Sequence, residues 1–255
     1  MPRWRPESIL SLLFTVLLFS ACVSTGVSPQ DKKKANAAIN LGEAYMSGRN
    51  YTAALGELLK AEKLNPTDPI LYNDLGLVYM AKEKYDMAVV HFQKAVRLKP
   101  DYSLAKNNLG SAYLVRKEWD KAIHVLEEVT GDMLYATPHF PLANLGWAYY
   151  NKGNYDKARH YLKEALDLQP EFYVAQLNLG RTYLATGQLH AALSMLEAAA
   201  QLNPKDPALL LELGRTYRLL GDYNNARLAL KGAIEYTEDS ALAVEASEEL
   251  NKIYQ

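Results

Sequence analysis

Cysteine is nearly absent from this 255-residue sequence, which contains Cys22 and no other. An intramolecular disulfide is therefore excluded, and so is a zinc site built from several cysteines. An excess of one charge is missing too, because 28 Lys and Arg residues face 29 Asp and Glu residues, for a formal net charge of -1. A balanced chain lacks the basic surface that binds DNA or RNA, so we expect no nucleic-acid partner.

Sequence motifs of the common enzyme classes are also missing. The chain contains no glycine-rich phosphate-binding loop, no Gly-x-Ser-x-Gly nucleophile motif and no His-Glu-x-x-His zinc motif. We therefore predict that the protein is not an enzyme and needs neither a cofactor nor a metal.

The first 21 residues have the layout of a secretory signal peptide. Arg3 and Arg5 precede an apolar run at residues 9–19, and two small residues then lead to Cys22. A helix that spans a bilayer needs about 20 apolar residues, so this run is too short to span one comfortably. The sequence favours export with cleavage over a helix retained in the membrane.

The segment Phe-Ser-Ala-Cys at residues 19–22 resembles the lipobox of bacterial lipoproteins. The resemblance implies that Cys22 becomes the acylated first residue of the mature chain, although Phe19 stands where leucine is usual. The alternative is an ordinary signal peptide with a chance cysteine. By the same resemblance Val23, in place of aspartate, favours the outer membrane, with the protein facing the periplasm. The polar residues 22–34 predict a flexible tether behind the lipid anchor.

A Leu-Gly pair recurs six times along the rest of the chain. The glycines are Gly42, Gly76, Gly110, Gly146, Gly180 and Gly214. Successive glycines are 34 residues apart, except for 36 between Gly110 and Gly146, and each is followed by a tyrosine three residues later and an alanine twelve residues later. This pattern resembles the tetratricopeptide repeat, a unit of two antiparallel helices.

The chemistry of the pattern supports the same fold. Glycine inside a helix costs ~1 kcal/mol relative to alanine, so a glycine at one register needs a packing reason, such as close approach of the second helix. A large apolar residue recurs on that second helix: Leu58, Phe92, Leu126, Leu162, Leu196 and Leu230. We expect these residues to fill the seam between the two helices of each repeat.

The predicted fold is all-α, a right-handed α-solenoid of six tetratricopeptide repeats. The repeats are predicted at residues 35–68, 69–102, 103–138, 139–172, 173–206 and 207–240. Repeat three is two residues longer than the other repeats and lacks the usual proline. This difference predicts a longer loop at residues 131–138. Residues 241–255 form an amphipathic pattern that predicts a capping helix over the exposed end of the stack.

A row of polar residues lies two positions before each glycine. It consists of Asn40, Asp74, Asn108, Asn144, Asn178 and Glu212. In this repeat family the first helix of each unit lines the ligand groove, and a ladder of amides can bind the backbone of an extended peptide. The alternative is that asparagine is simply common before Leu-Gly.

Repeat four carries aromatic residues at helical spacing, namely Phe140, Trp147 and Tyr150. We interpret them as an aromatic binding face. The alternative is that the neighbouring long loop buries them as part of the core. A third candidate is the basic group Arg181, Arg215 and Arg218, which suits a carboxylate or an acidic segment. Its alternative is internal pairing with Glu212, three residues before Arg215.

Four histidines fall on the second helices: His91, His124, His160 and His190. His124 and His160 share a register one repeat apart, so a metal pair is conceivable. The favoured interpretation is that all four are solvated surface residues.

Six repeats behind an acylated cysteine, with a longer loop after repeat three, resemble the PilF/PilW pilotin family of type IV pilus biogenesis lipoproteins. The resemblance implies an outer-membrane lipoprotein that binds secretin subunits and supports their localisation and assembly. The alternative is a lipoprotein scaffold for other envelope machinery, such as cell-wall hydrolases or polysaccharide or protein export. The expected partner is thus a secretin subunit or another envelope protein.

Overall fold

The computed structural model describes residues 27–132 and 134–254, and these ranges contain helices and no strand. The predicted signal peptide and the predicted lipidation of Cys22 lie outside the described residues. The helices are α1 Pro29–Ser47, α2 Tyr51–Leu64, α3 Pro69–Ala81, α4 Tyr85–Leu98, α5 Ser103–Val115, α6 Trp119–Thr130, α7 His139–Asn151, α8 Tyr155–Leu168, α9 Tyr173–Ala185, α10 Leu189–Leu202, α11 Pro207–Leu219, α12 Tyr223–Tyr236 and α13 Ser240–Asn251. The prediction of an all-α helical-repeat fold is confirmed. Among the described helices, each is too short or too polar to cross a membrane.

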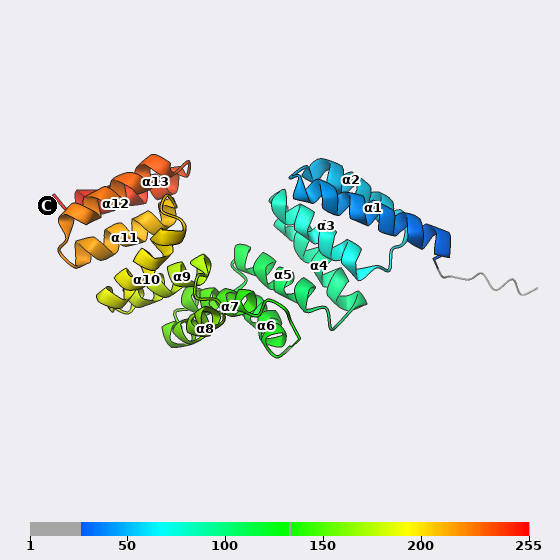
Figure 1. The fold of residues 1–255 in the computed structure, drawn as a ribbon, viewed down its shortest axis with the longest axis horizontal. Coiled ribbons are helices and arrows are strands. Elements are labelled where there is room, and N and C mark those ends of the chain that lie inside the picture. Colours follow the sequence, from blue (N-terminus) through cyan, green and yellow to red (C-terminus); the bar gives the residue numbers. More distant parts are fainter. Residues whose placement is uncertain (1–26, 133, 255) are drawn as a thin grey trace, which may run out of the picture.

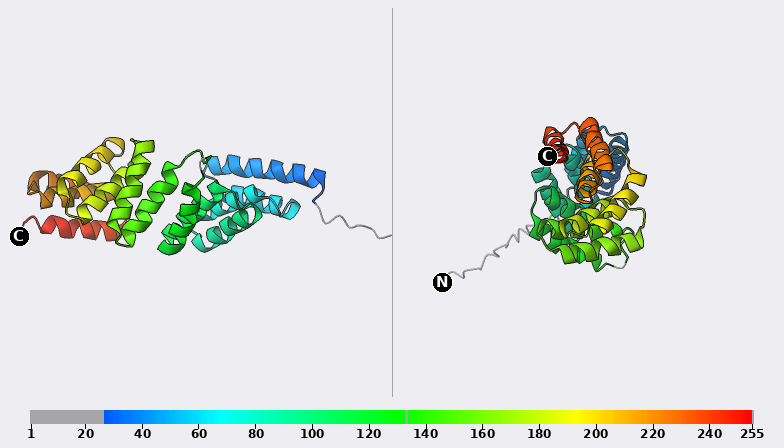
Figure 2. Two further views of the ribbon diagram at one scale, coloured as in Figure 1. Left: turned by 90° about the horizontal axis from the view of Figure 1, so that it is seen from below. Right: turned by 90° about the vertical axis from the view of Figure 1, so that its left-hand side faces the viewer.

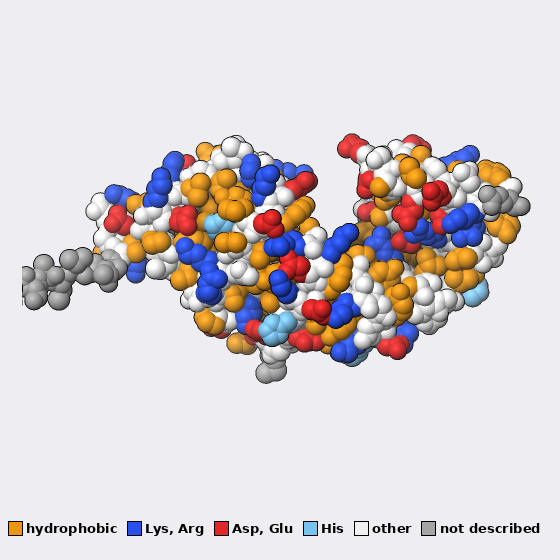
Figure 3. All heavy atoms as spheres, turned by 180° about the vertical axis from the view of Figure 1, so that it is seen from behind, with side chains coloured by type: hydrophobic (Ala, Val, Ile, Leu, Met, Phe, Trp, Pro, Cys, Tyr) orange, Lys and Arg blue, Asp and Glu red, His pale blue; other side chains and the backbone are white. Residues whose placement is uncertain are grey.

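The helices stack as six hairpins that form an arch, with α1 and α13 near opposite ends of an elongated array (Figures 1 and 2). The first helices of successive hairpins contact one another along the whole array. The second helices, within the described residues, contact only their neighbours in the chain. The first helices, α1, α3, α5, α7, α9 and α11, therefore form the inner layer of the arch. We call their solvent-facing side the inner face; a space-filling view shows a deep notch between the two arms (Figure 3).

The repeated glycines allow the two helices of each hairpin to pack closely. A Cβ atom added to Gly42 would lie 2.9 Å from Leu58 Cγ, and one added to Gly110 would lie 2.6 Å from Leu126 Cγ. The same clash arises in every repeat, and all six large seam residues are completely buried. The predicted seam is confirmed, and the cost of helical glycine is offset by this approach.

The hairpin turns differ between the two halves of the chain. Each turn contains one residue with positive φ, a conformation that glycine adopts without a Cβ clash. In the first three repeats this residue is not glycine: Arg49 (φ 56°), Glu83 (φ 57°) and Lys117 (φ 59°). In the last three it is Gly153, Gly187 and Gly221. The first three turns therefore contain backbone strain that the last three lack.

The first helix begins earlier than the sequence analysis predicted. Residues 29–34, assigned there to a flexible tether, are the first turns of α1, so this part of the tether prediction is wrong. Ser28 caps the helix by accepting a hydrogen bond from the Asp31 backbone N–H at 3.0 Å, and Pro29 occupies the first helical position. Serine before proline is a strong helix start, and the lysines that follow remain exposed on the helix surface.

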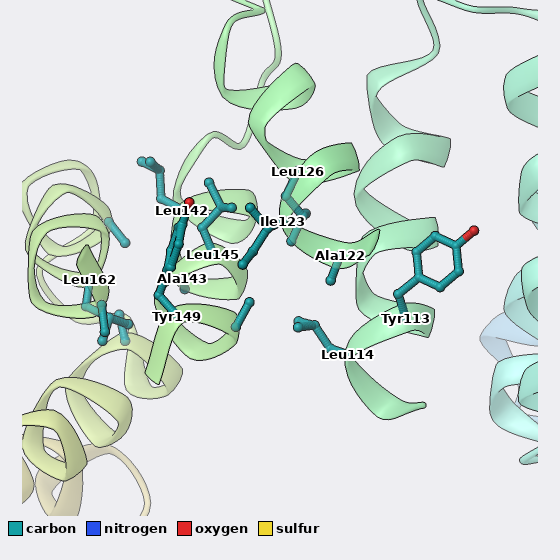
Figure 4. Packing of buried hydrophobic residues seen from close by; sticks show 14 of the residues in the cluster. Tyr113, Leu114, Ala122, Ile123, Leu126, Leu142, Ala143, Leu145, Tyr149 and Leu162 are labelled. Atoms are coloured by element: carbon teal, nitrogen blue, oxygen red, sulfur yellow. The ribbon is translucent and has the colours of Figure 1, made fainter. Parts of the chain in front are cut away.

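The two halves of the arch join at repeats three and four. The longer connection between α6 and α7 is present, as predicted, with residue 133 not described. Ile123 and Leu126 of α6 pack with Leu142 and Leu145 of α7 in one buried cluster (Figure 4). This apolar contact makes the array continuous across the break in its repeat length.

The C-terminal helix α13 covers the last hairpin. Leu242, Leu250 and Ile253 pack against a buried cluster that includes Leu230, whereas Val244 is exposed. A solenoid exposes an apolar surface at its end unless a final helix covers it. In the structure α13 occupies that position.

Candidate protein-binding face

The ladder residues of the inner face form hydrogen bonds between neighbouring repeats. The Nδ2 atom of Asn108 donates to Asn73 Oδ1 at 2.8 Å. The Nδ2 atom of Asn144 donates to Asn107 Oδ1 at 3.3 Å and to Ser111 Oγ at 3.0 Å. Asn73 and Asn107 directly precede ladder residues and were not among the residues predicted from the sequence. Part of the ladder's bonding capacity is thus satisfied within the chain, while Asn40 at the N-terminal end is exposed.

Asp74 is the ladder residue with the least satisfied side chain. It is only 4% exposed, and Asn73 Nδ2 donates to its Oδ1 atom at 3.3 Å. Its Oδ2 atom is buried and has no hydrogen-bond partner in the described part of the chain. The pKa of Asp74 is raised to about 7, mainly by burial and also by the negative charges of Glu43 and Asp68, while the hydrogen bond from Asn73 acts in the opposite direction. Within the described residues, the Oδ2 atom of this carboxyl group therefore lacks a donor, and the group forms no salt bridge.

The ladder continues in the C-terminal half as an ion-pair network. The Nε atom of Arg181 donates to Glu212 Oε1 at 3.0 Å, and its Nη1 atom donates to Asn178 Oδ1 at 3.4 Å. Arg215 lies on the other side of Glu212, with Nη1 3.6 Å from Oε2. Asn178 and Glu212 are both buried. Arg181 and Arg215 are therefore paired within the chain, as in the alternative interpretation of the basic group.

The capping helix completes this network. The Nε atom of Arg218 donates to Glu249 Oε2 at 3.0 Å, and Arg215 pairs with both Glu245 and Glu249. Burial would raise the pKa of Glu249, but Lys252, Arg218 and Arg215 together hold it below its ordinary value. Glu245 and Glu249 were not predicted from the sequence, because nothing in the repeat pattern shows how α13 lies against α11.

The predicted aromatic face divides into two separate groups. Trp147 and Tyr150 stack with ring centroids 5.2 Å apart, and the guanidinium of Arg181 lies 5.4 Å from the Trp147 ring. Phe140, two helical turns earlier, instead packs edge-on against Phe172 at 5.2 Å and is 43% exposed. Phe172, just before α9, was missed. The three predicted residues do not form one continuous surface.

The histidines occupy two different environments. His91 stacks between the rings of Tyr72 and Tyr79, at 6.0 and 5.0 Å, and its Nδ1 atom is buried. Burial lowers its pKa, so the prediction of a solvated residue is wrong for His91. His124 and His160 are exposed and lie next to Glu128 and Glu164 of their own helices. Residues 27–132 and 134–254 contain no cluster of three or more side chains that would hold a metal ion.

Comparison with protein families supports the repeat assignment along most of the helical array. Models described as tetratricopeptide repeat match residues 69–102, 140–172 and 184–247, and a model described as TPR repeat matches residues 42–82. No curated protein matches the chain by sequence.

Comparison with solved structures gives matches over nearly the whole array. The structure of PilF from Pseudomonas aeruginosa is similar at a TM-score of 0.74 and 20% identity, covering 86% of this chain and 99% of that one. PilW, described as a widely conserved type IV pilus biogenesis factor, is similar at 0.75 and 24% identity, covering 87% and 98%. A chain of the Cut9-Hcn1 complex reaches 0.78 at 18% identity, but only 43% of it is covered. At these identities the matches establish the fold alone.

Proposed function

This chain is a tetratricopeptide-repeat protein, and we propose that it is an outer-membrane lipoprotein that binds secretin subunits and supports their assembly for type IV pilus biogenesis. One observation supports this choice above other repeat scaffolds. The similarity to PilF and PilW extends over at least 98% of those chains as well as 86–87% of this one. A general repeat similarity does not require the same number of hairpins, as the partial match to the Cut9-Hcn1 chain illustrates.

The proposed anchor is the acylated Cys22. Several acyl chains on one cysteine would hold the protein stably at a membrane, which a single chain does only marginally. A helical array tethered in this way would present its inner face to secretin subunits at high local concentration. Anchor and inner face together would then concentrate the subunits where the pore assembles.

Deletion of the gene tests the proposal most simply. We expect secretin multimers to disappear from the outer membrane and surface pili to be lost, while secretin monomers remain detectable. Restoring the wild-type gene should restore both. Unchanged multimers and intact pili, together with altered cell-wall hydrolases or export, would favour the alternative of another envelope scaffold.

The anchor requires a separate test. The Cys22→Ala variant should fold normally, with an unchanged circular-dichroism melting curve, but should no longer fractionate with the outer membrane. A variant that fractionates like the wild type would contradict the lipid anchor without affecting the proposed partner.

A further inference from the structure

The inner layer in the N-terminal half contains a buried acidic group, Asp74, that forms no ion pair among the described residues and has no donor to its Oδ2 atom. We propose that Asp74 receives the cationic head of a lysine or arginine side chain from an extended segment of the partner protein. The inference rests on the proposed function only in requiring a protein partner on the inner face. It adds the chemistry of that partner, a basic residue at one defined position.

The carboxyl group of Asp74 is built into the inner layer and yet is incompletely bonded. Its Oδ2 atom is buried and has no donor in the described part of the chain, although Asn73 Nδ2 donates a hydrogen bond to Oδ1. Asn73 in turn accepts from Asn108 of α5, which places Asp74 within the row of contacts that joins α3 to α5. A buried polar atom without a partner loses its hydrogen bond to water without replacement, so a donor from the partner gains affinity here.

The charges around Asp74 are of one sign. Glu43 on α1 and Asp68 before α3 both raise the pKa of Asp74. The pKa of Tyr102, in the α4–α5 connection, is raised mainly by burial and also by these three carboxyl groups. Among the described residues, Glu43 and Asp74 form no salt bridge. A cation placed at Asp74 therefore meets attraction from three carboxylates, and the described groups that shift the pKa of Asp74 include no positive charge.

The chain itself shows what an acid at this register binds. Glu212 occupies the same ladder position in the last repeat, and its main partner is Arg181, one residue after the glycine of the preceding repeat. The corresponding residue for Asp74 is Glu43, one residue after Gly42. The position that supplies a guanidinium to Glu212 thus supplies a second carboxylate to Asp74. No cation of residues 27–132 or 134–254 forms a salt bridge with Asp74, so we assign this role to a side chain of the partner.

A cationic partner would also change the ionisation of the site. Burial holds the pKa of Asp74 at about 7, so the free protein is about half protonated there at neutral pH. A bound cation stabilises the carboxylate and releases the proton. Since the ionised fraction rises about tenfold between pH 6 and pH 8, the affinity for a basic segment should rise by about the same factor.

Peptide selection tests the inference directly. A phage-displayed library of random 12-residue peptides is selected at pH 8 on the full chain in detergent, in parallel with the Asp74→Asn variant and with Asp156→Asn, an exposed aspartate on α8, as the matched control. We expect Lys or Arg at a fixed position from the wild type and the control, and loss of that preference with Asp74→Asn. Peptides without basic preference, or the same preference in Asp74→Asn, would overturn the inference and leave the adaptor function intact.

A second variant tests the inference independently if Asp74→Asn folds poorly. Glu43→Arg changes an exposed residue and reproduces the arrangement of Arg181 and Glu212 at Asp74. It should fold and should lose at least tenfold in affinity for a selected basic peptide, measured by fluorescence anisotropy. In the wild type this affinity should rise about tenfold from pH 6 to pH 8. Unchanged affinity in Glu43→Arg, or no rise with pH, would contradict the inference; failure of all variants to select any peptide would contradict the adaptor function as well.

Discussion

The ladder residues share one helical register, but their bonding partners differ between the two halves of the inner face. In the C-terminal half the ladder residues Asn178 and Glu212 belong to an ion-pair network in which arginines of α9 and α11 meet glutamates of α11 and α13. In the N-terminal half the same register carries amide pairs and one unpaired carboxyl, that of Asp74. The fold is alike in both halves, but among the described residues the buried ladder acid of the N-terminal half, Asp74, lacks the ion pair that Glu212 has in the C-terminal half. The C-terminal half satisfies its own charges, and that feature suits a rigid end of the array.

The largest expected difference between the halves concerns pH. The folded protein keeps the proton on Asp74 up to about pH 7, because burial raises its pKa, whereas the unfolded chain releases it near pH 4. Stability should therefore fall as the pH rises from about 4 to about 7, by up to about 4 kcal/mol. Asp74→Asn should remove this loss, seen as the difference between wild type and variant in urea unfolding at pH 5 and pH 8. An identical pH dependence in both proteins would contradict the assignment.

Substitution of a repeat glycine should lower the free energy of unfolding equally in both halves. Gly110→Val and Gly180→Val each place side-chain atoms against a fully buried leucine, Leu126 or Leu196. Overpacking of this kind should lower the free energy of unfolding by about 3 kcal/mol in either half. Gly56→Ala, at an open position of α2, is the control and should stabilise by up to about 1 kcal/mol. A large loss from only one of the two valine variants would mean that the hairpins do not pack alike.

The ion-pair network should respond to the loss of one acid. Glu212→Gln leaves Arg181 and Arg215 without their shared partner in a mostly buried position. We expect a loss of about 2 kcal/mol, opposite in sign to the effect of Asp74→Asn at pH 8. Thermal unfolding of both variants at pH 8 provides the comparison. Two losses of equal size would remove the distinction between a satisfied and an unsatisfied half.

The smallest expected effect lies in the hairpin turns. Glu83→Gly relieves a positive φ at an exposed residue and should stabilise by about 0.5 kcal/mol, whereas Gly187→Ala introduces such strain and should cost about 1 kcal/mol. Denaturant unfolding at pH 7 resolves both changes. A loss in Glu83→Gly would show that its side chain makes a contact worth more than the strain.

Much of the fold could be predicted because the glycine register has a single physical explanation. A glycine that meets a buried leucine in every repeat fixes where each helix pair closes, and the register needs no knowledge of distant contacts. The start of α1 was missed because a run of lysines was read as a linker, although Ser28 and Pro29 form a helix start. At residues 28–34 the capping residues determine the local structure, and the run of charged residues does not prevent a helix.

The candidate site was less predictable because it depends on contacts between repeats. Ladder residues could be found by register, but their partners Asn73 and Asn107 lie one position away, and Glu249 lies on a helix with no repeat pattern. His91 was misplaced because its burial comes from Tyr72 and Tyr79 of the neighbouring helix. Register shows which residues share a face and not which of them are already bonded.

The central claim is that a secretin subunit binds the N-terminal half of the inner face. Photo-crosslinking in living cells tests it, with a benzoylphenylalanine replacing in turn the exposed Asn40 of α1, Leu219 of α11 and Asn224 of α12, an outer-layer helix. We predict a crosslinked product with secretin from position 40 alone. A product from position 219 or 224 instead, or none with secretin from position 40, would contradict the account.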